Sequence, residues 1–359
     1  MSQIIKHHTN YKDAADNIFY NVEIRNPIEA NSRILMKYEE TKNTPVLSGD
    51  AADYYITVAR FDIPAENIPT FYCLHNLFPG TYTLDYRITL TYLGVDYQAY
   101  LIYVPTSTNT SITDTLLPIY QYQQFLDLIN TAYQTAYNAM IAVNGGIGGA
   151  LDLALQASPP LFTFNRATQL LGINVQTQYP VQGVELHMNW ELYQFFRPTE
   201  IFFNSYNDPN DKDVEITVKD NYNNTTTIGG VNYYQMGPDF SQLHLWYDLR
   251  KLIIVSNNLP VQREYISSNN QDGSSNNLAI LTDFAPQMGL NPSETLSRFE
   301  FFPTGPYRLQ DLNSANDIRK IDFQIYYLDK YDNLREMYLE PGENLNMKIL
   351  FVRKDSLAW

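Results

Sequence analysis

Residues 321–354, IDFQIYYLDKYDNLREMYLEPGENLNMKILFVRK, contain the clearest strand pattern of the chain. Successive side chains of a β-strand point to opposite faces, so apolar residues at every second position indicate a strand with one buried face. This alternation predicts two half-buried strands, with a short third strand around 336–340. Pro341-Gly342 then turns the chain before the last strand. The apolar positions are Phe323, Ile325 and Tyr327 in the first strand, and Leu345, Met347, Ile349 and Phe351 in the last.

Two earlier stretches repeat this pattern in weaker form. Residues 85–105 (DYRITLTYLGVDYQAYLIYVP) align with 322–341, and 55–64 (YITVARFDIP) align with 252–260 (LIIVSNNLP). Both pairs occur in the same order along the chain, as a duplicated β-domain would leave them. The alternative interpretation is that any two amphipathic hairpins look alike.

Composition points to an all-β protein. The chain has 359 residues, of which 44% are hydrophobic and 18% charged, and it contains 29 Tyr and 18 Phe. These values predict a packed core and exclude a disordered chain. Aromatic and β-branched residues favour the half-buried surface of a sheet, and Asn, Gly, Pro and Ser between the apolar runs indicate many turns.

Charge and cysteine content exclude several classes of function. The net charge is −15, and direct nucleic-acid binding is not expected because it requires Lys and Arg against phosphate. The single cysteine, Cys73, excludes an intrachain disulfide framework. The N-terminus lacks the apolar core of a signal peptide. No stretch of the sequence reaches eighteen consecutive apolar residues, so a membrane-spanning helix is not expected.

The predicted organisation has an N-terminal arm and two β-domains. Residues 1–16 form a polar arm, 17–205 a first jelly-roll-like β-domain, and 206–359 a second, with the polar stretch 205–213 as the junction. One long helix is expected at about 114–143 as an insertion in the first domain. Its apolar stripe recurs at three- and four-residue steps and should be buried against a sheet: Tyr122, Phe125, Leu126, Ile129, Tyr133, Ala136 and Met140.

No catalytic, cofactor-binding or metal site is predicted. The five histidines, His7, His8, His75, His187 and His244, share no ligand spacing. The glycine-rich run at 145–149 follows a helix rather than a strand, so a helix stop is favoured over a phosphate loop. Asp208, Asp211 and Asp213 lack the ligand spacing of a calcium loop, and a solvated acidic turn is favoured. The chain is therefore not expected to be an enzyme.

Several stretches resemble jelly-roll capsid proteins of the penton or minor capsid type from virophages and polinton-like DNA viruses. They are DYYITVARFDIPAENIPTF (53–71), RFEFFPTGPYRLQDLNSANDIRKIDFQIYYLD (298–329), PGENLNMKILFVRK (341–354) and, in the middle of the chain, YQYQQFLDLINTAYQTAYNAM, PPLFTFNRATQLLGI and NWELYQFF. The resemblance implies jelly-roll sandwiches, self-assembly into an icosahedral shell and a virion location, without a cofactor or transferable site residues. The resemblance does not decide the number of jelly rolls. We expect two rolls, and the alternative is a single jelly roll with an inserted middle domain.

The leading functional hypothesis is a structural capsid subunit, either penton or minor or major capsid protein. Its partners would be other copies of itself and other capsid proteins, and it would be made in the host-cell cytoplasm. The alternative is a receptor- or glycan-binding viral spike, because exposed tyrosines can form a sugar-binding platform or a protein interface. A β-sandwich glycoside hydrolase is a third hypothesis, but no carboxylate pair supports it.

Overall fold

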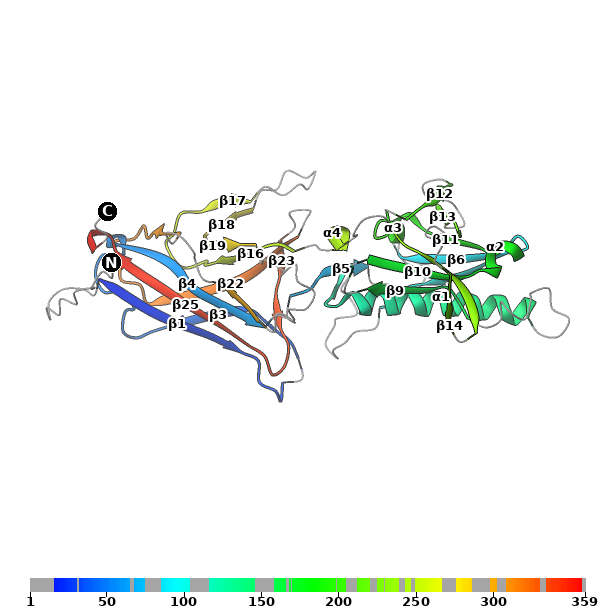
Figure 1. The fold of residues 1–359 in the computed structure, drawn as a ribbon. Coiled ribbons are helices and arrows are strands. Elements are labelled where there is room, and N and C mark those ends of the chain that lie inside the picture. The colour runs from blue at the N-terminus through cyan, green and yellow to red at the C-terminus, as the bar shows by residue number, and fades with distance from the viewer. Residues whose placement is uncertain are drawn as a thin grey trace. The chain divides into compact units, whose positions relative to one another are not determined.

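Two compact units make up the structure, a computed structural model whose fold is drawn in Figure 1. Unit 1 comprises the described residues of 1–68, 249–288 and 296–359, and unit 2 those of 69–248. The structure describes residues 16–30, 32–64, 68–74, 85–103, 116–145, 158–165, 168, 170–197, 199–204, 212–219, 225–228, 230–238, 243–246, 249–266, 276–285, 298–301, 308–329 and 334–356.

Eight antiparallel strands in two sheets form the frame of unit 1. The first sheet has the order β1-β25-β4-β20, and in the second β22 lies between β16 and β3, with β19 beyond β16. In chain order the strands are β1 (Asn17–Arg25), β3 (Lys37–Thr41), β4 (Tyr54–Pro64), β16 (Leu249–Val255), β19 (Ile280–Phe284), β20 (Arg298–Phe301), β22 (Lys320–Asp329) and β25 (Asn344–Arg353).

The order in which the chain visits these strands is that of a jelly roll. Numbered one to eight along the chain, the strands lie in the order 1-8-3-6 in one sheet and 2-7-4-5 in the other. An eight-stranded, double-sheet arrangement of this kind defines the jelly roll. The jelly-roll prediction is confirmed. The arrangement is that of the alternative, a single roll closed by the N- and C-terminal strands, with the middle of the chain inserted between β4 and β16.

Side chains from the two sheets meet in the core of unit 1. Phe61 on β4 lies 5.3 Å from Phe284 on β19 between ring centroids, and Tyr20 on β1 lies 6.3 Å from Tyr38 on β3. The predicted inward residues of β22 and β25 are buried, as Phe323 and Phe351 show. Shorter elements complete the unit: β2 (Ile34–Leu35) paired with β24 (Tyr338–Leu339), β17 (Glu264–Ile266) with β18 (Asn276–Leu278), β21 (Gln310–Asp311), β23 (Leu334–Glu336), and 3-10 turns at Ala51–Asp53 and Lys354–Ser356.

Unit 2 contains two larger antiparallel sheets and a strand pair. The first sheet has the order β12-β13-β11-β6-β7, the second β14-β15-β10-β9, and β5 pairs with β8. The strands are β5 (Phe71–Leu74), β6 (Arg87–Tyr92), β7 (Val95–Tyr100), β8 (Leu116–Ile119), β9 (Leu161–Asn165), β10 (Leu170–Gln176), β11 (Glu185–Met188), β12 (Ile201–Phe203), β13 (Val214–Ile216), β14 (Thr225–Ile228) and β15 (Val231–Met236). This order differs from that of unit 1.

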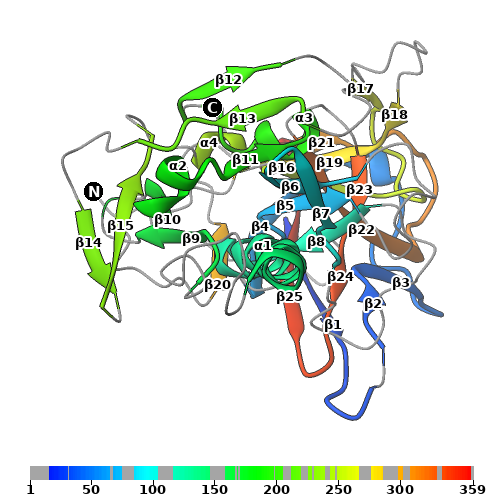
Figure 2. The ribbon, with the colours of Figure 1, turned by 90° about the vertical axis from the view of Figure 1, so that its right-hand side faces the viewer.

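The long helix of unit 2, α1 (Tyr122–Asn144), packs against β6, β7 and β9 (Figure 2). It begins later than the predicted residue 114, because Leu116–Ile119 forms β8, in which Pro118 pairs with Tyr72 of β5. Short helices lie at α2 (Gln178–Gln182), α3 (Trp190–Tyr193) and α4 (Leu243–Trp246).

The predicted boundary at 205–206 falls inside unit 2 and is corrected here. Residues 205–211 lie outside the described residues, but the strands on either side of them, β12 and β13, pair with each other. The proposed duplication is also wrong, because β4 lies in unit 1 and β6–β7 in unit 2, whereas both of their repeats, β16 and β22, lie in unit 1. Residues 85–105 and 322–341 share only the period-two pattern that every amphipathic hairpin shows.

Candidate assembly surfaces

The histidines do not assemble a reaction centre in the described part of the chain. His7, His8 and His75 lie outside it, and the side chain of His244 is not described. His187 is buried on β11, with its Nε2 atom 3.2 Å from a Glu185 carboxylate oxygen. Burial lowers the pKa of His187, and the hydrogen bond to Glu185 opposes this shift. Among the described residues, no group of three or more His, Cys, Asp or Glu side chains could hold a metal ion.

The other candidate motifs have structural roles where they are described. Asp213 is buried, and its carboxylate accepts a hydrogen bond of 2.8 Å from the backbone N–H of Trp190 at the start of α3. Asp208 and Asp211 lie outside the described residues, as do 146–149 of the glycine run, whereas Gly145 caps the C-terminus of α1. Cys73 is buried, and burial raises the pKa of its thiol to about 12, which disfavours the reactive thiolate.

The predicted apolar stripe of α1 forms the core of unit 2 and is not an exposed interface. Phe125, Ile129 and Tyr133 are fully buried, which confirms the prediction. Phe125 lies 5.0 Å from Phe71 and 5.2 Å from Trp246 between ring centroids. The opposite face of α1 is exposed and carries Gln, Thr, Asn, Ala and Val side chains with a single acidic residue, Asp127.

An exposed aromatic side chain marks the outer face of the first sheet in unit 1. Phe19 on the edge strand β1 is 57% exposed and lies opposite Leu350 of β25. The Lys348 ammonium group lies 5.3 Å from the Phe19 ring centroid, within the range of a cation–π contact. The Phe19 ring can bury apolar area against a partner protein, and the Lys348 ammonium group can pair with an acidic group of that partner. This face can therefore serve as a protein contact.

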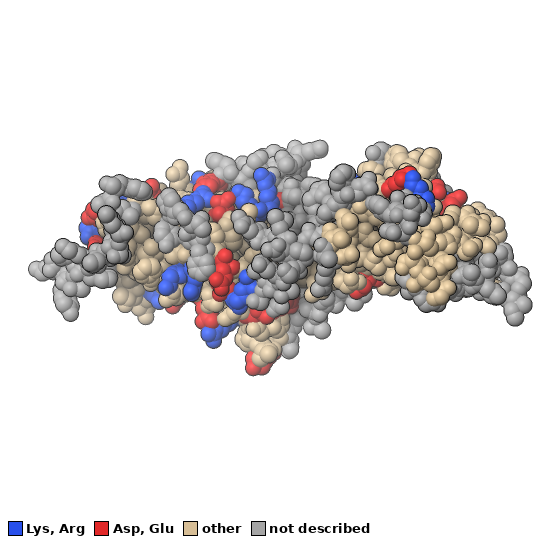
Figure 3. Space-filling model, viewed as in Figure 1, with Lys and Arg blue, Asp and Glu red and all other residues tan. Residues whose placement is uncertain are grey.

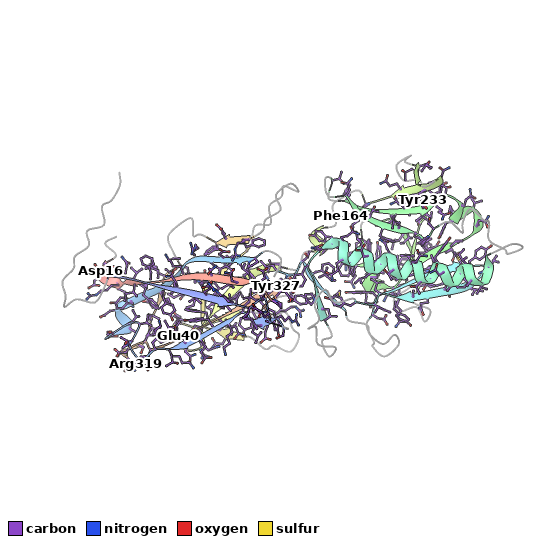
Figure 4. The ribbon with its side chains drawn as sticks, turned by 90° about the horizontal axis from the view of Figure 1, so that it is seen from below. Asp16, Glu40, Phe164, Tyr233, Arg319 and Tyr327 are labelled. Atoms are coloured by element: carbon purple, nitrogen blue, oxygen red, sulfur yellow. The ribbon has the colours of Figure 1, made fainter. Side chains whose placement is uncertain are left out.

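The edge strands β1 and β3 are joined by a hydrogen-bonded cluster of side chains. The hydroxyl groups of Tyr20 and Tyr38 lie 2.8 Å apart, and both donate to the carboxylate of Glu40, which Figure 4 labels. The Lys42 ammonium group lies 3.5 Å from the same carboxylate. Hydrogen bonds from Tyr20 and Tyr38 lower the pKa of Glu40 because they favour its ionised form. The cluster ties the two sheets together at this side of the roll.

The predicted N-terminal arm leads into the same region of unit 1. Residues 1–15 lie outside the described residues, and Asp16, labelled in Figure 4, is the first described residue before β1. The carbonyl oxygen of Asp16 accepts a hydrogen bond of 2.8 Å from the backbone N–H of Arg353. The described chain therefore begins at the end of the β1–β25 pair, where the predicted arm would join it.

The structure is a single jelly roll with a large inserted domain. The candidate site residues that it describes lie in the core or take part in structural hydrogen bonds. These features are those of a structural β-sandwich protein. The family model of the Sputnik minor capsid protein V18/19 matches residues 18–353, and the chain belongs to this family. It is thus a structural capsid protein.

Two curated relatives come from the Sputnik virophage. Structural protein V19 is 27% identical over 205 residues, which cover 54% of this chain and 94% of V19. The uncharacterized protein V18 is 26% identical over 149 residues, which cover 36% of this chain and 87% of V18.

Two solved structures share the fold over almost the whole chain. A chain of the Sputnik virophage, solved by cryo-EM, matches with a TM-score of 0.69 at 24% identity and covers 96% of this chain and 100% of its own length. The crystal structure of the mavirus penton protein matches with a TM-score of 0.59 at 15% identity, over 94% of this chain and 99% of the penton chain. The resemblance to virophage capsid proteins is confirmed.

Proposed function

We propose that this chain is a penton subunit, which forms closed rings with copies of itself and contacts other capsid proteins of an icosahedral virion. The observation that carries the proposal is the match to the mavirus penton protein over 94% of this chain and 99% of that one. A match to the roll alone would not extend over unit 2. The inserted unit thus supports this role over that of a generic jelly-roll protein.

The surfaces of unit 1 are consistent with permanent protein contacts. Stable interfaces of this kind bury roughly 2,000 Å² or more and include aromatic residues flanked by charges. The Phe19–Lys348 pair and the arm next to Asp16 are the parts of unit 1 that we assign to such contacts. The net charge of −15 would repel phosphate, so these contacts are made to protein and not directly to the genome.

The subunit would be part of the virion and be made in the host-cell cytoplasm. The buried Cys73 is a free thiol, which is consistent with synthesis in a reducing compartment. We assign a non-enzymatic role, which the membership of a capsid protein family supports.

Native mass spectrometry of the purified full-length chain tests the proposal, together with labelling of intact virions by an antibody against unit 2. We expect closed rings of one defined copy number, and label at the fivefold vertices. A chain that remains monomeric with and without its virion partners would contradict ring formation. Label spread evenly over the capsid faces would contradict the penton assignment.

A second candidate function, glycan binding by unit 2, is favoured by one cavity. A cavity of about 300 Å³ lies beside β9, β10 and β15. Its lining has no charged residue and includes Thr163, Asn165, Thr168 and Gln235 beside apolar Leu170 and Met236. Neutral hydrogen-bonding groups beside apolar ones suit an uncharged sugar. A glycan array probed with the wild-type chain and Gln235→Ala would test this function, and binding that is equal for both would exclude this cavity.

A further inference from the structure

The largest sheet of unit 2 exposes apolar side chains at both of its edges, Phe202 at one and Val95 at the other. In the order β12-β13-β11-β6-β7, the edge strands are β12 and β7. Folded proteins usually place charges or proline on such edges, because an exposed apolar edge promotes association. Strand β12 reads Ile201-Phe202-Phe203 and carries no charge. An edge of this composition is expected where another protein covers it.

The exposed side chains around β12 have the composition of an interface centre. Phe202 is 62% exposed, and Phe203 is 41% exposed and lies 5.7 Å from Trp190 between ring centroids. The guanidinium group of Arg197 lies 5.9 Å from the Trp190 ring centroid. Trp and Arg are enriched among the residues that dominate binding energy. We call Trp190, Arg197, Phe202 and Phe203 the β12 patch.

The opposite edge has an unusual turn. Leu93 and Gly94 connect β6 to β7, both with positive φ, and the φ of Leu93 is 51°. Asn or Gly adopts this conformation at little cost, whereas the branched side chain of a leucine is strained there. Leu93 is also 68% exposed, and Val95 beside it is 52% exposed. A strained apolar side chain that is largely exposed gains little from burial within the unit, and we take it to mark a contact with a partner. We call Leu93 and Val95 the β7 tip.

We propose that the β12 patch of one copy binds the β7 tip of the next copy, and that this repeated contact closes the ring of the proposed function. The two surfaces lie at opposite edges of one five-stranded sheet. Four steps of about 4.8 Å between neighbouring strands place these edges about 19 Å apart. The β7 tip therefore cannot cover the β12 patch of its own copy. Contact between unlike surfaces of identical chains generates a ring when the rotation closes.

A second copy fits these edges better than a charged partner does. Every copy has one β12 patch and one β7 tip, so contact between copies removes both apolar surfaces from water. Asp96 follows Val95 in β7, and its carboxylate is already paired with the Lys212 ammonium group at 3.1 Å. Contact between copies therefore leaves the Asp96 carboxylate paired, and the Arg197 guanidinium keeps its contact with the Trp190 ring.

Two single variants and their mixture test the contact in the full-length chain. Phe202→Glu damages only the β12 patch, and Leu93→Lys damages only the β7 tip. We expect each variant alone to self-associate at least about tenfold more weakly than the wild type, as for an interface centre. An equimolar mixture should form a one-to-one dimer, because it contains one intact patch and one intact tip. Native mass spectrometry and sedimentation read out both results.

Two further variants separate assembly from folding. Leu93→Asn places a residue suited to the turn, so it should raise the melting temperature of the chain while weakening assembly. Leu161→Asn is the matched control, since Leu161 is an apolar edge residue of the other sheet, 40% exposed, and it should leave assembly unchanged.

The outcomes distinguish this contact from the proposed function on which it rests. If the wild type forms rings and Phe202→Glu or Leu93→Lys forms them equally well, the contact is wrong and the penton proposal stands. If Leu93→Lys assembles normally while Phe202→Glu does not, the β12 patch meets something other than the β7 tip. A mixture that forms no dimer also overturns the contact, and a monomeric wild type overturns both proposals.

Discussion

Unit 1 has paired charges on its edge strands β1 and β3, although β1 also exposes Phe19, whereas unit 2 exposes apolar side chains at both edges of its largest sheet. On the edge strand β3, Glu39 lies 2.6 Å from the ammonium group of Lys320 and 3.3 Å from that of Lys37. On β1, Glu23 pairs with Arg25 at 2.5 Å. In unit 2 the edge strand β12 exposes Phe202, and the turn before the edge strand β7 exposes Leu93.

The same contrast is visible over the wider surfaces. In the view of Figure 3, basic and acidic side chains are interspersed over unit 1 and are few over the described surface of unit 2. Lys and Arg between positions 69 and 248 are limited to Arg87, Arg166, Arg197, Lys212 and Lys219. Charged edge strands disfavour edge-to-edge pairing of sheets. The charges of unit 1 therefore disfavour such association, whereas the apolar edges of unit 2 permit it.

The largest expected effect concerns the core of unit 2. Phe125→Ala should lower the free energy of unfolding by roughly 3–5 kcal/mol, because it removes a fully buried ring from an aromatic cluster. Urea denaturation followed by tryptophan fluorescence measures this loss, since Trp190 and Trp246 both lie in unit 2. Thr135→Ala on the exposed face of α1 is the control. A loss below about 1 kcal/mol for Phe125→Ala would contradict the burial of this stripe.

A smaller loss is expected from a buried carboxylate in unit 1. Asp322 at the start of β22 accepts hydrogen bonds from the Ser256 hydroxyl at 2.6 Å and from the backbone N–H groups of Asn257 and Asn258 at 3.0 and 2.9 Å. Asp322→Ala leaves these donors without their acceptor and should cost about 2–4 kcal/mol.

Calorimetry of the two variants sharpens the comparison between the units. Asp322→Ala should move the transition of unit 1, and Phe125→Ala that of unit 2. Asp355→Ala, at an exposed ion pair with Arg353, should change stability by less than about 0.5 kcal/mol. One transition that shifts equally with either buried substitution would show that the units unfold together.

Deleting residues 1–12 should affect assembly and leave folding almost untouched. The pairing of β1 with β25 begins at Asn17, beyond the deletion, so the melting temperature should stay nearly unchanged. Assembly should weaken about tenfold if the arm's apolar side chains bind a neighbour. A matched variant keeps the length of the arm and replaces Ile4, Ile5 and Tyr11 by Ser. Analytical ultracentrifugation compares both variants with the full chain. If the deletion variant assembles as well as the full chain, the arm has no role in assembly.

The smallest expected effect is a pH dependence in unit 1. The hydrogen bonds of Tyr20 and Tyr38 hold the pKa of Glu40 below its usual value of 4.5 in the folded chain. This contribution to stability is therefore fully present above pH 4.5 and is lost as pH falls through the lower folded pKa. Melting temperatures at pH 6 and pH 3 should differ less for Glu40→Gln than for the wild type. An identical difference for both would show that the cluster does not contribute.

Sequence patterns predicted those features that depend on neighbours along the chain. Alternation at 321–354 located β22 and β25 and their buried faces, and the three- and four-residue spacing of Phe125, Ile129 and Tyr133 located the buried face of α1. The start of α1 was wrong because the pairing of Pro118 with β5 cannot be read from helical spacing. The edge residues Leu93 and Phe202 were missed, although a Leu-Gly turn in place of Asn-Gly was a readable signal.

The sequence by itself determined strand-forming stretches, one long amphipathic helix, an acidic surface and the resemblance to virophage capsid proteins. Only the tertiary structure decided that Asn17 pairs with Val352, that the roll is single, and that the middle of the chain is inserted between β4 and β16. The physical reason is that alternation sets the face a side chain takes but not the partner of its strand. Every amphipathic strand offers the same backbone groups, and packing of the complete core selects among them.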